Sequence, residues 1–148
     1  MNDRESRITL LHEAAAERVL VFDGSQGVYL LTRGLSIDDF GGPQFEGCPE
    51  ALIYSRPDVL RDMHNAYLEA GADLIETNTF GGMGIVLAEY GLQDSATDIN
   101  QRAARLAREC ADAYATPTKP RFVVGTMGPT TKAISITGGV TFDELIAT

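Results

Sequence analysis

The sequence has few of the residues that build metal sites or disulfide frameworks. Its 148 residues include two cysteines, two histidines and no tryptophan. Cys48 and Cys110 lie far apart, with no CxxC pair or cysteine and histidine cluster nearby, so we interpret both as ordinary free thiols. We interpret His12 and His64 as partly exposed residues of helices. The chain therefore offers no obvious set of three or four zinc ligands, and we assign it no metal site.

Positive charge and long apolar runs are also scarce. Twelve lysines and arginines stand against 21 aspartates and glutamates, and the formal net charge of -9 repels nucleic acid and anionic lipid surfaces. The first ten residues, MNDRESRITL, are charged where a secretory signal is apolar. No segment approaches the ~20 consecutive apolar residues of a membrane helix. We therefore expect a cytoplasmic protein without nucleic-acid or membrane partners.

What the chain does contain is an alternation of strand-like and helical segments. Apolar stretches lie in RVLVF (residues 18–22), ADLIETNTF (72–80) and RFVVGTMGPTT (121–131). The uninterrupted apolar run of the first is typical of a strand buried on both faces of a parallel sheet. Strands that alternate with helices predict an α/β fold.

Helical periodicity fills most of the remaining chain. We expect an amino-terminal helical extension at residues 1–17, ahead of a domain at 18–148, and helices near 57–70 and 96–115. Ser55 and Ser95 are candidate caps of the latter two, and Cys110 falls on the apolar stripe that faces the core. Thr141 and Glu144 have the spacing of a capping box for a last helix. Residues 32–54 are rich in glycine and lack a period, which predicts a long irregular excursion.

The spacing of the strands narrows the fold further. The polar ends of the three strands fall near residues 23, 78 and 127, where both open α/β sheets and (β/α)₈ barrels bind ligands. Eight strands at intervals of about 50 residues would exceed the ~250 residues typical of such a barrel. We therefore expect the first part of a (β/α)₈ barrel, truncated after about three strands.

The strand ends carry the candidate binding residues. Asp23, followed by Gly24, either accepts backbone N–H groups in a structural role or binds the ammonium group of an amino acid ligand. A strand ending in Asp also begins the phosphoryl-transfer pattern of haloacid dehalogenases, but Ser25 stands where that pattern has its second Asp. In the second strand, Glu76 needs a partner if it is buried, and its neighbours are the polar residues 77–79.

Four stretches together carry a family resemblance. In this order and spacing, VFDGSQG, HNAYLEAGADLIETNTFGG, INQRAARLARECAD and VVGTMGPTTKAIS resemble the homocysteine-binding domain of cobalamin-dependent methionine synthases. The resemblance covers residues 18–148, and EAGADLIETNTF is its most specific part. The first motif departs from the family pattern at Ser25, Gln26 and Val28, which leaves the shape of the pocket open.

The resemblance implies an activity and a set of binding residues. The implied fold is a (β/α)₈ barrel in which zinc deprotonates the thiol of homocysteine, and the thiolate takes a methyl group from methylcobalamin to give methionine. Asp23 and Gly24 would hold the amino acid head group, and Thr77, Asn78 and Thr79 would line the same mouth. No catalytic residue is assigned. The implied partners are homocysteine and downstream folate- and cobalamin-binding domains of the same chain.

The resemblance also implies where zinc is not held. The zinc cysteines of the family lie in later strands, and Cys48 and Cys110 match neither of their positions. We therefore expect the complete enzyme, not these 148 residues, to hold zinc and cobalamin, and this chain alone to be inactive. Two alternatives remain: a non-catalytic module that binds an amino acid or self-assembles through open sheet edges, and a methyltransferase with betaine or S-methylmethionine as donor.

Overall fold

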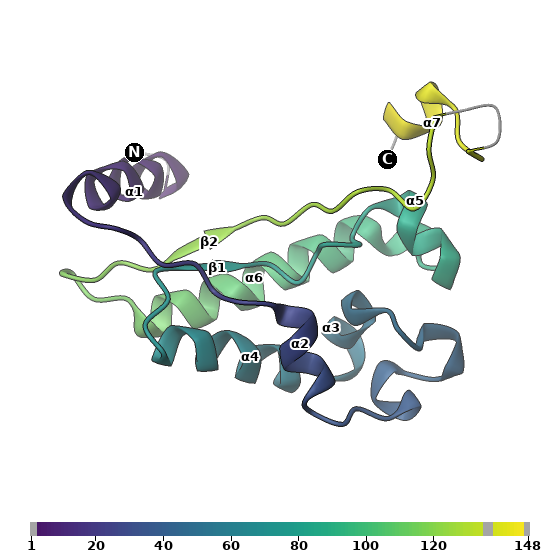
Figure 1. Cartoon of the computed structure of the whole chain (residues 1–148), viewed down its shortest axis with the longest axis horizontal. Helices are drawn as coiled ribbons and strands as arrows, with labels where there is room; N and C mark the ends of the chain where they lie inside the picture. Colours follow the sequence, from purple (N-terminus) through teal and green to yellow (C-terminus); the bar gives the residue numbers. More distant parts are fainter. Residues whose placement is uncertain (1–2, 135–137, 147–148) are drawn as a thin grey trace.

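The computed structural model describes residues 3–134 and 138–146, in which a small parallel sheet is covered by helices (Figure 1). Strand β1 (Leu74–Glu76) pairs in parallel with β2 (Phe122–Val124), with Ile75 opposite Val123. Phe22 forms an isolated parallel bridge to Leu74. The three extended segments therefore run in the same direction, as the sequence predicts.

Two long helices build the core against this sheet. Helices α4 (Pro57–Glu69) and α6 (Ala96–Tyr114) pack against each other, and both contact β1. Figure 1 shows α6 running along the two strands, with α4 beside it. The apolar residues of α6 recur at intervals of three and four, so they form one stripe that faces the sheet. Cys110 lies on this stripe and is buried, which confirms its expected place in the core.

The ends of these helices differ in part from the sequence prediction. Ser55 ends α3 (Leu52–Ser55) and hydrogen-bonds to the Ala51 carbonyl, so it does not cap α4. The N-cap of α4 is Arg56, and Pro57 supplies the first helical position, where its missing N–H costs no hydrogen bond. Ser95 is the N-cap of α6 but makes no side-chain cap hydrogen bond there. The expected cap at Ser55 is therefore wrong, whereas Ser95 occupies the expected N-cap position without the side-chain hydrogen bond.

The first extended segment is less covered than predicted. Val19, Val21 and Phe22 keep 85%, 55% and 48% of their surface exposed. The segment lies at the edge of the sheet, where its hydrogen bonds run to Asp73 and Leu74. The expectation of a strand buried on both faces is wrong for this segment, because the segment lies at the edge of the sheet, whereas α4 and α6 contact the neighbouring strand β1.

An ion pair fixes the start of this segment to the start of β1. The Arg18 guanidinium donates to both carboxylate oxygens of Asp73 at 2.7 and 2.8 Å, and the Val21 N–H donates to the same carboxylate at 2.9 Å. The Arg18 guanidinium holds the pKa of Asp73 below its usual range. Helix α1 (Asp3–Glu17) precedes this anchor and lies at the end of the sheet away from α5 and α7 (Figure 1).

Short helices occupy the connections. The excursion after α2 (Gln26–Leu31) contains η1 (Ile37–Phe40), η2 (Pro43–Phe45), η3 (Pro49–Ala51) and α3, so it is more ordered than an irregular loop. Helix α5 (Gly84–Leu87) and η4 (Ala88–Tyr90) end at Gly91, and η5 (Gln93–Ser95) leads into α6. Helix α7 (Phe142–Ile146) begins with the expected capping box, in which Thr141 and Glu144 exchange hydrogen bonds. Residues 147 and 148 lie outside the described residues.

His64 has a different environment from the expected one. It is 1% exposed, so the prediction of a partly exposed helix residue is wrong for His64, whereas His12 on α1 is exposed. Burial, with a smaller contribution from the Arg61 charge, lowers the pKa of His64 to about 4. Its Nδ1 has no hydrogen-bond partner within the described residues. His64 is therefore a neutral core residue of α4 at neutral pH.

Candidate functional site

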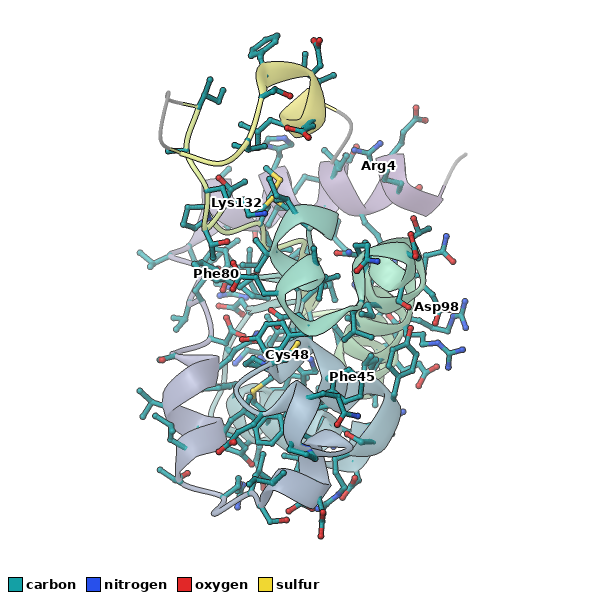
Figure 2. The ribbon with its side chains drawn as sticks, turned by 90° about the vertical axis from the view of Figure 1, so that its right-hand side faces the viewer. Arg4, Phe45, Cys48, Phe80, Asp98 and Lys132 are labelled. Carbon is teal, nitrogen blue, oxygen red and sulfur yellow. The ribbon has the colours of Figure 1, made fainter. Side chains whose placement is uncertain are left out.

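The polar ends of the three parallel segments meet at one edge of the sheet. Asp23 follows the first segment, and its Oδ2 accepts a hydrogen bond from the Glu76 N–H at 3.0 Å. The Thr77 N–H, just past the end of β1, donates to the Val124 carbonyl at 2.9 Å. Figure 2 shows the molecule from the side on which the strands end, with Phe80 and Cys48 toward the middle of the view.

The Asp23 carboxylate has structural partners within this edge. Besides the Glu76 N–H, it is hydrogen-bonded by the Gln26 side chain, whose Nε2 also donates to the Glu76 carbonyl at 2.7 Å. Partial burial raises the pKa of Asp23, and these hydrogen bonds oppose the rise without cancelling it. Asp23 therefore ties the first segment to the end of β1, which matches the structural reading of this residue.

Three threonines join the ends of β1 and β2. The hydroxyl groups of Thr77 and Thr79 lie 2.6 Å apart, and the Thr79 hydroxyl donates to the Thr126 carbonyl at 2.7 Å. In return, the Thr126 N–H donates to the Thr77 hydroxyl at 3.0 Å. Both threonines lie past the end of β1, where the Thr79 N–H donates to the Thr77 carbonyl at 2.9 Å, and this tight turn brings the two hydroxyl groups together.

A cavity of about 550 Å³ opens beside these strand ends. Its walls come from the segments around residues 24–27, 47–50, 76–81 and 126–131. Of the residues proposed from sequence, Gly24, Thr77 and Asn78 line it. Asp23 and Thr79 are not among its described lining residues. Their hydrogen bonds to the Glu76 N–H and the Thr126 carbonyl hold the segments that form its wall. A cavity of this size is typical of a site for a small molecule.

The excursion between α2 and α4 supplies one wall that the sequence analysis missed. The Asn78 amide donates to the Pro49 carbonyl at 2.8 Å, and the Gly81 N–H donates to Glu50 Oε1 at 2.6 Å. Glu50 is 6% exposed, although it lies in a connection rather than in a strand. A single acidic residue in a glycine-rich stretch carries no pattern, so only the folded chain reveals its place at the cavity.

A close backbone approach shapes the opposite side of the cavity. The Gly128 N–H donates to the Phe80 carbonyl at 2.8 Å. A Cβ atom at Gly128 would lie 2.7 Å from the Phe80 ring and from its carbonyl oxygen. Glycine is therefore required at position 128 for this contact with Phe80, an exposed aromatic residue of the cavity wall.

The described residues do not fit a zinc ion. No group of three or more histidine, cysteine, aspartate or glutamate residues in 3–134 and 138–146 is arranged to hold a metal. Burial raises the pKa of the Cys48 thiol to about 11 and raises that of Cys110 as well, so both sulfurs stay protonated. A cysteine binds zinc as a thiolate, and the raised pKa values favour the neutral thiol at both positions. No helix in the same ranges is long and apolar enough to cross a membrane.

The arrangement suits binding more than bond making. The cavity offers backbone groups, the Thr77 hydroxyl, the Asn78 amide and the carboxylates of Glu50 and Glu76. Within the described residues, the wall has no histidine or thiol that could act as base or nucleophile. We therefore describe it as a binding site for a small molecule, in which these polar groups and two carboxylates stand among apolar side chains such as Leu30 and Val86.

Comparison with known proteins agrees with this geometry. The homocysteine S-methyltransferase family matches residues 20–148. Methionine synthase of Mycobacterium leprae is 48% identical over 124 residues, which cover 84% of this chain and 10% of the relative. Methionine synthase of Mycobacterium tuberculosis is 43% identical over 130 residues, which cover 88% of this chain and 11% of the relative.

A solved structure shares the fold. The metallated form of the homocysteine methyltransferase MmuM from Escherichia coli superposes with a TM-score of 0.66 at 22% identity, covering 80% of this chain and 41% of that one. The expectation of an α/β fold that forms the first part of a barrel is confirmed by this likeness and by the parallel strands. The chain spans about a tenth of the length of the two curated relatives above. Because the family match covers most of its length, the chain belongs to the homocysteine S-methyltransferase family.

Proposed function

We propose that this chain forms the homocysteine-binding part of a methyltransferase that converts homocysteine to methionine. The observation that supports this proposal most directly is the cavity of about 550 Å³ at the carboxyl ends of three parallel segments. Ligands bind at this end of the sheet in parallel α/β folds. The names of the mycobacterial relatives and of the Escherichia coli structure support this substrate and reaction.

The residues at the strand ends have separate roles in this proposal. Gly24, Thr77 and Asn78 line the cavity, so their polar groups are placed to contact the amino acid head group. Asp23 and Thr79 keep the segments that carry these groups in register, through the Glu76 N–H and the Thr126 carbonyl. The Asp23 carboxylate also adds negative charge that favours the substrate ammonium.

The activating groups belong to other parts of the full-length protein in this proposal. Methylcobalamin is the methyl donor, zinc binds the thiol, and folate- and cobalamin-binding domains are partners in the same polypeptide. The described residues do not fit a zinc site, so we assign them no step at the metal. Their contribution is to bind and orient the substrate, which lowers the entropic cost of bringing the thiol to the methyl donor.

The direct test is kinetic and uses the full-length protein. Wild type is assayed for methionine formation from homocysteine with methylcobalamin, betaine or S-methylmethionine as donor. We expect turnover with methylcobalamin and a KM for homocysteine that rises about tenfold in Asp23→Ala, because the substrate ammonium loses nearby negative charge. Turnover with only another donor overturns the cobalamin assignment, and an unchanged KM removes Asp23 from the site.

One observation favours a second candidate, a self-assembling module. The edge segment leaves Val19, Val21 and Phe22 exposed, and an uncovered strand edge is a template for pairing with another chain. Sedimentation of the isolated 148-residue chain, together with titration by homocysteine, separates the two. A stable multimer that does not bind homocysteine favours the module over the methyltransferase part.

A further inference from the structure

We propose that Glu50 is a further substrate-binding residue, whose carboxylate binds the α-ammonium group of the amino acid in the cavity. The proposal deepens the function proposed above and rests on it. It identifies the wall formed by the excursion, rather than the strand ends alone, as the part of the site that selects a cationic head group.

The first argument is the burial of the Glu50 carboxylate. The residue is 6% exposed and borders the cavity. A carboxylate withdrawn from water requires compensating partners, and the strongest are cations. No Lys, Arg or His within the described residues forms an ion pair with Glu50 at 4.0 Å or less. The described residues therefore supply no counter-charge to this carboxylate.

The second argument is the capacity left on the two oxygens. Oε1 accepts the Gly81 N–H at 2.6 Å, and Oε2 lies 3.8 Å from the Cys48 sulfur. An ionised carboxylate accepts up to about four hydrogen bonds, so both oxygens retain acceptor sites. The Cys48 thiol keeps its proton because burial raises its pKa to about 11, so it can only be a weak donor.

The third argument is that the carboxylate is held in place before any ligand arrives. Glu50 lies in η3, beside the Pro49 carbonyl that accepts the Asn78 amide at 2.8 Å. Together with the Gly81 N–H, this hydrogen bond fixes the wall to the chain that follows β1. Asp23, in contrast, is already bound by the Glu76 N–H and the Gln26 amide, and it is not among the described lining residues. A preorganised acceptor binds a cation at a lower entropic cost.

The test compares two ligands on three forms of the full-length protein. Homocysteine and 4-mercaptobutyrate, which lacks the α-ammonium group, are titrated by calorimetry into wild type, Glu50→Gln and Glu46→Gln. Glutamine keeps an acceptor for the Gly81 N–H but removes the charge. We expect Glu50→Gln to weaken homocysteine binding about 10- to 100-fold and to leave 4-mercaptobutyrate binding within about twofold. Glu46, an exposed residue of the same excursion, is the matched control and is expected to change neither.

The outcomes separate this inference from the proposed function. If wild type does not bind homocysteine, the proposed function and the assignment of Glu50 both fail. If wild type binds homocysteine and Glu50→Gln binds it equally well, or loses both ligands to the same extent, only the assignment of Glu50 fails. Should Glu50→Gln not fold, Glu50→Asp keeps the charge one methylene further back. That variant is then expected to lose homocysteine affinity selectively, and an equal loss of both ligands overturns the inference.

Discussion

Apolar side chains are buried in the helices α4 and α6 but exposed on the edge segment around residues 19–22. On the side of α4 and α6, Leu60, Met63 and Ile99 are fully buried, at 0% exposure. On the edge segment, Val19 is 85% exposed and Phe22 is 48% exposed. Residues 19–22 are an uninterrupted apolar run, whereas α4 and α6 carry many polar residues, so the more apolar segment is the less buried one and the difference lies in the neighbouring elements. An apolar run predicts a strand and its direction, but its burial depends on the elements that lie against it.

The largest expected effect is on the helix-covered side. Leu60→Ala is expected to lower the free energy of unfolding by about 2–5 kcal/mol, because it leaves a cavity in a packed core. Urea titration monitored by circular dichroism measures the change. Val19→Ala is the control from the edge segment and is expected to cost less than about 0.5 kcal/mol. Equal losses of unfolding free energy in the two variants would mean that the edge segment is packed in solution and does not differ from the helix-covered core.

Acid is expected to act on the same core through His64. Its folded pKa of about 4 lies below the ~6.5 of an unfolded histidine, so the unfolded chain binds a proton first as the pH falls. Stability is therefore lost between about pH 6.5 and pH 4, and we expect a loss of about 2 kcal/mol between pH 7 and pH 4.5. Urea titrations at both pH values measure it. In His64→Leu we expect this loss of unfolding free energy between pH 7 and pH 4.5 to disappear. If the variant loses as much as wild type, His64 is not its source.

The anchor of the edge segment is expected to be weaker than the core. Asp73→Asn removes the charge that binds Arg18, and we expect a loss of about 1–2 kcal/mol in unfolding free energy at pH 7. The pKa of Asp73 is lowered in the fold, so its contribution is present above the unfolded pKa of ~3.9 and disappears as the pH falls through the folded value. The difference between wild type and Asp73→Asn therefore shrinks below about pH 4, in a lower window than that of His64.

The smallest expected effect on stability is at the exposed edge itself. Phe22→Ser is expected to lower the unfolding free energy by about 1 kcal/mol, because about half of the side chain is already exposed to solvent. If the isolated chain self-associates through this edge, the same substitution reduces that association, which sedimentation velocity measures. A large loss of stability in Phe22→Ser would show that the ring is covered in the folded chain.

Much of the fold follows from local patterns in the sequence. The stripe of α6, the direction of the three extended segments and the capping box at Thr141 each depend on residues close in the chain. The cap predicted at Ser55 failed because Pro57 fixed the start of α4 two residues beyond it, which makes Arg56 the N-cap. The burial of His64 was missed, although Leu60 and Leu68 lie four residues to either side of it and share its buried face of α4.

The site was predictable only where it lies on strand ends. Parallel strands bring their carboxyl ends together by geometry, which is why Gly24, Thr77 and Asn78 emerge on the same cavity. Glu50 lies on an excursion whose path is set by single hydrogen bonds to Asn78 and Gly81. Such long-range contacts leave no period in the sequence. The division between Asp23 as a support and Glu50 as a wall residue is likewise visible only in three dimensions.

The threonine hydroxyls at the mouth have a consequence for the response to salt. The bonds between Thr77, Thr79 and Thr126 join neutral groups, and dissolved ions screen charges rather than neutral hydrogen bonds. Helix α1 meets α6 through an exposed ion pair, Arg7 with Asp112, at 3.2 Å. Raising the ionic strength should therefore loosen the periphery of the molecule while the rim of the cavity keeps its shape.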